Sequence, residues 1–168
     1  MRAHPWFARF GLAATGSAET VTTSSPPPAL IARYTLTPGV GVGPLLFGDR
    51  VADHHELEPR YGRPGSIFDF EHDYAEYTIA GLEDMLIVYA DREGRIDSVG
   101  FYEYCLLDGR ELIGMGVGEL LVLLGLPSAV EAEEVGREIE LLYGYDALGL
   151  TVWTIDGEVC VVQAGLNE

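Results

Sequence analysis

The chain has 168 residues and carries 27 acidic side chains against ten arginines, with no lysine, so its formal net charge is −17. A surface this negative repels nucleic acid and anionic lipids, because binding to phosphate groups needs Lys and Arg. The same charge favours encounter with a basic protein, although it also serves solubility alone. Hydrophobic residues make up 48% of the chain, enough for a packed core, and no apolar run is long enough to span a membrane.

Residues 1–29 differ in composition from the rest of the chain. They contain a proline triplet, Pro26–Pro28, after a stretch rich in Ser, Thr and Ala. This composition predicts a disordered leader. Whether the leader is an export signal, a tail or a mis-assigned start is left open, because its short apolar part is interrupted by Gly11 and Gly16.

Residues 30–104 are predicted to form a first unit of one helix followed by antiparallel strands. The helix is expected from Asp49, a candidate cap, to a stop at Gly62 and Pro64, and Pro59 is expected to shorten or kink it. A strand is expected over residues 75–81, followed by a hairpin over 86–102 that turns at "DREG".

Residues 105–168 repeat this order and are predicted to form a second unit. Gly116 is expected to begin a helix that Gly125 and Pro127 end. A strand over residues 137–145 and a hairpin over 150–165, turning at "IDG", complete the unit. The pattern predicts an α+β fold, with helices on one face of an antiparallel sheet and the other face partly open.

The stretch "GMGVGELLVLLGLP", from Gly114 to Pro127, resembles the signature of the BamE/SmpA-like superfamily, and the two units together resemble a β-lactamase-inhibitor-protein-like duplication. The resemblance implies a tandem α+β fold that acts without catalysis and binds other proteins through an exposed sheet face. The chain departs from these relatives because it lacks a lipid-anchor cysteine and a set of four cysteines, so no particular partner carries over.

Tyrosine, tryptophan and glutamate side chains near the two hairpins predict a protein-binding surface, since such surfaces combine aromatic anchors with a polar rim. Ordinary core packing is the alternative interpretation for each aromatic residue. No cofactor is expected. The candidate partner-binding residues are Tyr89, Tyr102, Glu103, Glu133, Glu134, Glu138, Tyr143 and Trp153.

The stretch "DHHE", Asp53–Glu56, offers an alternative metal site in which His54 or His55 acts with Glu56 and His72. Neighbouring histidines on a helix point about 100° apart, which argues against a joint clamp. Cys105 and Cys160 are too few for a disulfide framework, and a single bridge between them is left open.

These observations favour a non-catalytic, acidic protein-binding module in the cytoplasm, most simply an inhibitor or an immunity-type protein that neutralises a basic partner such as a toxin. An envelope-associated assembly factor and a small metalloenzyme that uses His54, His55 and His72 are the alternatives, the first of which needs export. The oligomeric state is not predicted.

Overall fold

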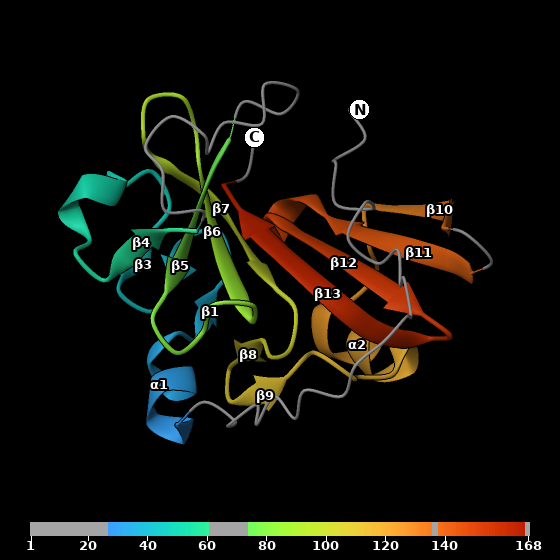
Figure 1. Cartoon of the computed structure of the whole chain (residues 1–168). Coiled ribbons are helices and arrows are strands. Elements are labelled where there is room, and N and C mark those ends of the chain that lie inside the picture. The colour runs from blue at the N-terminus through green and yellow to red at the C-terminus, as the bar shows by residue number, and fades with distance from the viewer. Residues whose placement is uncertain (1–26, 61–73, 136–137, 167–168) are drawn as a thin grey trace, which may run out of the picture.

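The computed structural model describes residues 27–60, 74–135 and 138–166 (Figure 1). Strands take up 48% of this part of the chain and helices 16%. The helical elements are α1 (Pro28–Arg33), the 3-10 turn η2 (Val51–Asp53), α2 (Val117–Leu124) and the 3-10 turn η3 (Asp146–Leu148). No helix in the described part is long and apolar enough to cross a membrane.

An eight-stranded antiparallel sheet dominates the fold. Its strand order is β10-β11-β12-β13-β7-β6-β5-β4, so two four-stranded meanders lie edge to edge (Figure 1). The strands of the first meander are β4 (Leu57–Pro59), β5 (Ala75–Ile79), β6 (Leu86–Ala90) and β7 (Ile96–Phe101). Those of the second are β10 (Ala129–Val135), β11 (Glu138–Tyr145), β12 (Leu150–Ile155) and β13 (Glu158–Gly165).

The two meanders join where their last strands, β7 and β13, run antiparallel. Four residue pairs form this seam: Phe101 with Val162, Gly100 with Gln163, Val99 with Ala164 and Ser98 with Gly165. The seam leaves β4 and β10 as the outermost strands of the sheet.

A second, smaller sheet covers one side of the large one. Its strands are β1 (Leu36–Thr37), β2 (Gly41–Val42), β3 (Leu45–Leu46), β8 (Leu106–Leu107) and β9 (Arg110–Glu111). The parallel pair β1 and β8 joins segments that lie far apart in the sequence, through the register of Leu36 with Leu107.

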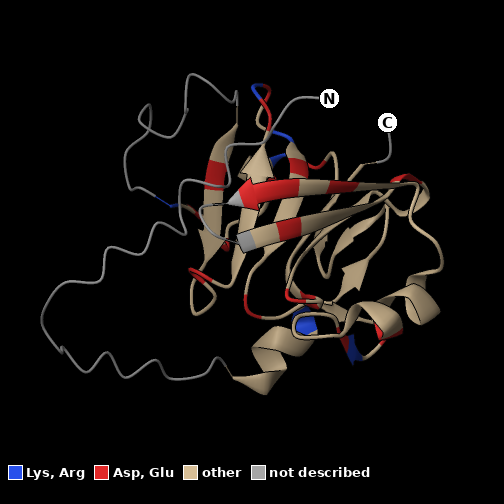
Figure 2. Ribbon diagram, turned by 90° about the vertical axis from the view of Figure 1, so that its right-hand side faces the viewer, with Lys and Arg blue, Asp and Glu red and all other residues tan. Residues whose placement is uncertain are grey.

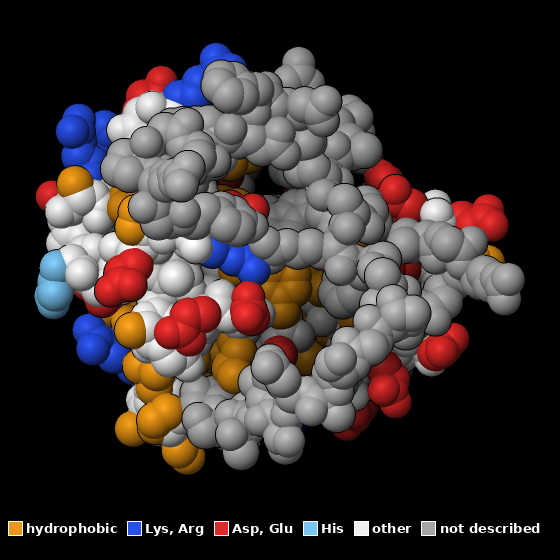
Figure 3. Space-filling model, in the orientation of Figure 1, with side chains coloured by type: hydrophobic (Ala, Val, Ile, Leu, Met, Phe, Trp, Pro, Cys, Tyr) orange, Lys and Arg blue, Asp and Glu red, His pale blue; other side chains and the backbone are white. Residues whose placement is uncertain are grey.

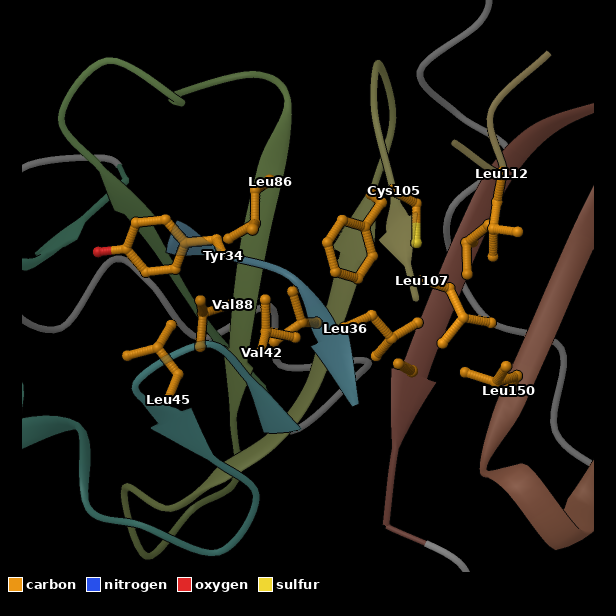
Figure 4. Close-up of a cluster of buried hydrophobic side chains, with 14 of the residues drawn as sticks. Tyr34, Leu36, Val42, Leu45, Leu86, Val88, Cys105, Leu107, Leu112 and Leu150 are labelled. Atoms are coloured by element: carbon orange, nitrogen blue, oxygen red, sulfur yellow. The ribbon is translucent and has the colours of Figure 1, made fainter. Parts of the chain in front are cut away.

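The hydrophobic core lies between the two sheets. Leu36 and Val42 of the small sheet face Val88 of the large sheet, and Leu107 lies near Leu150 (Figure 4). In β6 the side chains of Leu86, Val88 and Ala90 belong to this cluster, whereas those of Ile87 and Tyr89 do not. Because strand side chains alternate between faces, the large sheet has a core side and an opposite face, called the outer face below.

The helix expected in the second half is confirmed as α2. It begins after Gly116 and ends at Gly125, whose φ of 83° places it in a region that favours glycine. Leu120 is fully buried against the core, and Val117, Leu123 and Leu124 pack against the same cluster. Both expected hairpins are also present, and Asp156 and Gly157 have the positive φ values that a two-residue turn requires.

The prediction of a helix from Asp49 to Gly62 is wrong over the described residues. The chain makes only the short turn η2 and then extends into β4, where Leu57 pairs with Ile79 of β5. Only Val51 and Leu57 are buried here, too few for the apolar face of a helix. Pro59 cannot continue a helix but fits an outermost strand, which has one edge without hydrogen bonds.

The expected α+β fold of two helix-plus-sheet units is therefore also wrong. The chain is mostly β, with two sheets and two helices, and the helix expected to open the first unit is replaced in the described residues by the short turn η2. This composition conflicts with the fold that the resemblance to the BamE/SmpA-like superfamily implies. The disordered leader lies outside the described residues as far as residue 26, and α1 begins at Pro28. The division of the chain after residue 104 stays a prediction.

Candidate functional site

The middle of the outer face is apolar. In the strand register Trp153 of β12 stands between Leu142 of β11 and Val161 of β13. Trp153 is 6% exposed, and its indole Nε1 is buried without a hydrogen-bond partner among the described residues. Figure 3 shows hydrophobic side chains gathered in the middle of this face.

Small residues occupy the outer face at the seam. Gly100 of β7 stands opposite Gln163 of β13 and Ile87 of β6. The Gln163 Nε2 atom donates a hydrogen bond to Ser98 Oγ over 3.1 Å, which links the two meanders through side chains. Gly100 and Ser98 are both buried.

A polar cluster borders the apolar area on the side of β5 and β6. The Tyr89 and Tyr102 hydroxyl oxygens lie 3.2 Å apart, within hydrogen-bond distance. Burial raises the pKa of Tyr89, and the neighbouring Tyr102 and Glu76 raise it further. Arg60 donates to Glu76 over 3.1 Å and to Asp84 over 2.9 Å. The Tyr89 phenol is therefore neutral at physiological pH, and the arginine is already paired with carboxylates.

Carboxylates dominate the opposite border, on the β10–β11 hairpin. Glu131 and Glu133 lie on the outer side of β10, and Glu133 stands directly across from Glu140 of β11. Burial differs along this group: Glu131 is exposed, Glu133 half-buried and Glu140 buried. Figure 2 shows these acidic residues along the hairpin, whose tip is drawn in grey. Like charges directly across a strand pair repel, so a positive group near them is stabilised.

The core side of the same hairpin is apolar and exposed. Val130, 54% exposed, faces this side because it pairs with the core residue Tyr143. Ala132 pairs with Leu141, and the next residue along that side of β11, Ile139, is 66% exposed. The side chains of Val130, Ala132 and Ile139 thus form one exposed apolar patch, called the hairpin patch below.

The predicted partner-binding residues do not share one surface. Tyr89, Tyr102, Glu133 and Trp153 lie on the outer face, as the register and the tyrosine contact show. Glu134 lies on the core side of β10, whereas Tyr143 is buried in the hydrophobic core. Glu103 is exposed just after β7, and the side chain of Glu138 lies outside the described part. The structure thus brings four of the eight to one face.

Sequence reasoning missed the hairpin patch. The stretch "VEAEEV" has the alternation of a strand over Val130–Glu133, with apolar residues at 130 and 132 and carboxylates at 131 and 133. Only the carboxylates of this region were predicted to bind a partner, as the candidate residues Glu133, Glu134 and Glu138. Period-two alternation was the signal that could have identified β10.

The histidines of "DHHE" separate in the structure. His54 Nε2 lies 3.1 Å from Asp49 Oδ2, and His54 Nδ1 lies 3.9 Å from Glu56 Oε1. His55 points into solvent with its ring 3.5 Å from Glu56 Oε2, while His72 lies outside the described residues. In residues 27–60, 74–135 and 138–166 there is no group of three or more His, Cys, Asp or Glu that could hold a metal ion.

Neither cysteine has an activated thiol. Both are free of a disulfide. Burial, with the nearby Glu111, raises the pKa of Cys105 well above its ordinary value. Burial, with the nearby Glu140, raises the pKa of Cys160 to about 11. Since the thiolate is the nucleophile, both side chains are unreactive at neutral pH.

Comparison with protein-family models, curated proteins and solved structures found no match. Function therefore has to be argued from the surfaces described above.

Proposed function

We propose that the chain is a non-catalytic protein-binding module that inhibits or neutralises a basic partner, in the manner of an immunity protein acting on a toxin. The observation that carries this proposal is the acidic β10–β11 hairpin at the end of the sheet. Three glutamates follow within four positions of β10, and Glu131 and Glu134 are exposed. A lysine- or arginine-rich surface is the complement of such a strand.

The charge of the whole chain supports the same class of partner. A net charge of −17 creates an attractive field for a basic protein and accelerates its encounter. Specific contacts are still needed for a stable complex, because surface charge alters the association rate more than it alters the final affinity.

The outer face supplies groups that suit such contacts. Trp153, Tyr89 and Tyr102 are the aromatic types found at binding hot spots; Tyr102 is partly exposed, whereas Trp153 and Tyr89 are buried. Carboxylates border them on both sides: Glu131 and Glu133 on β10, and near β5 Glu76 and Asp84, which are paired with Arg60. An apolar centre with a charged rim is the usual arrangement of a protein interface.

The proposal can be tested on the product of the gene adjacent to this one. We expect that protein to be basic and to lose its activity when mixed with this chain. The triple variant Glu131→Gln, Glu133→Gln and Glu134→Gln should slow association about tenfold at low salt, and the difference should shrink as salt screens the charges. Stopped-flow mixing measures the rate.

The matched control removes the same number of carboxylates elsewhere. Glu58, Glu93 and Glu103 are exposed and lie outside the hairpin. Their joint replacement by glutamine should change the association rate much less than the hairpin variant does. Equal slowing by the two triple variants would place recognition away from the hairpin, and no binding at all would refute the proposed function.

A further inference from the structure

The outermost strand β10 has one edge that no described strand covers. It pairs with β11 through seven residues, from Ala129 with Gly144 to Val135 with Glu138. The strand order of the sheet ends at β10. Along such an edge, alternate main-chain N–H and C=O groups point outward and can pair with another strand.

The two sides of β10 differ in a way that selects the strand that can join it. On the core side Val130 and Ala132 belong to the exposed hairpin patch, with the exposed Glu134 next along the strand, while on the outer side Glu131 and Glu133 carry negative charge. An added strand would place its side chains alternately on these two sides. The matching sequence therefore alternates apolar residues with Lys or Arg.

We propose that a β-strand of the basic partner adds to β10, with its apolar side chains over the hairpin patch and its Lys or Arg side chains against Glu131 and Glu133. This binding by strand addition rests on the proposed function. It specifies where on the chain the basic partner binds and in what geometry. Main-chain hydrogen bonds give such a complex its affinity, and the alternating side chains give it specificity.

Charge argues against a second copy of the chain at this edge. Pairing two β10 strands would bring Glu131 and Glu133 of one copy against glutamates of the other. Like charges placed directly across a strand pair are destabilising. A partner strand with positive side chains avoids this repulsion.

The test uses the whole chain and a seven-residue peptide, acetyl-Lys-Val-Lys-Val-Lys-Val-Lys-amide. We expect the peptide to shift the NMR signals of β10 and to slow hydrogen exchange of its outward-facing amides about tenfold. A peptide with every amide N-methylated keeps the lysine ammonium groups and their charge but has no main-chain N–H donors, so it should bind about tenfold more weakly or not at all.

A charge-reversed pair tests the side-chain part of the proposal. The double variant Glu131→Lys and Glu133→Lys should no longer bind the Lys-Val peptide and should instead bind the corresponding Glu-Val peptide. The matched control, Glu58→Lys with Glu93→Lys, makes the same change in net charge at exposed positions outside β10 and should keep the original preference. Circular dichroism of both variants checks that they fold.

The outcomes distinguish strand addition at β10, called the edge mode below, from the proposed function. Equal binding of the N-methylated and unmodified peptides, or exchange protection that spares β10, would overturn strand addition. If the adjacent gene product still binds under those results, the proposed function stands without the edge mode. Strand addition by the peptide, with no binding or inhibition of that gene product, would support the edge mode and refute the proposed function.

Discussion

The variant Phe101→Ala is expected to lower the free energy of unfolding by about 3–5 kcal/mol, the range for removing a buried aromatic ring. Phe101 is fully buried and pairs with Val162 across the seam and with Leu86 inside the first meander. Its ring also packs edge-to-face against Tyr104, with centroids 6.0 Å apart. Urea denaturation followed by circular dichroism measures the change.

A loss of this size is a large fraction of the total stability of a typical domain, which is about 5–15 kcal/mol. The control is Val122→Ala, which shortens an apolar side chain that is 86% exposed on α2. It should change stability by less than about 0.5 kcal/mol. If the two variants unfold at similar urea concentrations, the seam is not the packed junction described above.

Two substitutions of Trp153 are expected to have very different effects. Trp153→Ala removes a ring that is 94% buried between Leu142 and Val161, with an expected cost of about 3–5 kcal/mol. Trp153→Phe keeps most of the packing and removes the indole N–H, which has no partner in the described structure. Relief from an unpaired donor, worth about 1–3 kcal/mol, offsets the lost volume.

We therefore expect Trp153→Phe to lie within about 1 kcal/mol of the parent chain, again by urea denaturation. Tyr102→Phe is the matched control, since it removes a hydroxyl that does have a partner, Tyr89. It should destabilise by about 1 kcal/mol. A Trp153→Phe variant as unstable as Trp153→Ala would mean that the indole N–H is in fact bonded.

Local signals in the sequence predicted the elements that depend on neighbouring residues. Gly116, Gly125 and Pro127 bound α2 because glycine and proline act on the backbone within a turn. The turn sequences "DREG" and "IDG" lead to the hairpins β6–β7 and β12–β13 for the same reason. These features need no knowledge of distant contacts.

Elements that form through pairing with residues far away in the sequence were either not predicted or predicted wrongly. The strands of the small sheet have two residues each, too short for any periodicity, and β1 depends on β8 for its parallel pairing. The stretch around His54 was expected to be helical, yet β5 pairs with Leu57–Pro59 and holds it extended. In both cases a tertiary contact outweighed the local preference.

The candidate site could be predicted only in part, because the face of a strand residue follows from register. Tyr143 and Trp153 lie on adjacent strands and were assigned to one surface. In the structure Trp153 pairs with Leu142, whereas Tyr143 pairs with Val152, so the two rings point to opposite sides of the sheet. A shift of one residue exchanges the two faces, and sequence alone does not set it.

Because of the seam, paired strands of the large sheet differ in how far apart their residues lie in the sequence. Within each meander, neighbouring strands are close in sequence, but the paired residues of β7 and β13 lie roughly 60 positions apart, which adds about 2 kcal/mol of closure entropy over a short hairpin. Seam pairing should therefore follow meander formation during refolding. Stopped-flow refolding can check this order: Val99→Ala at the seam should slow the final phase less than it speeds unfolding.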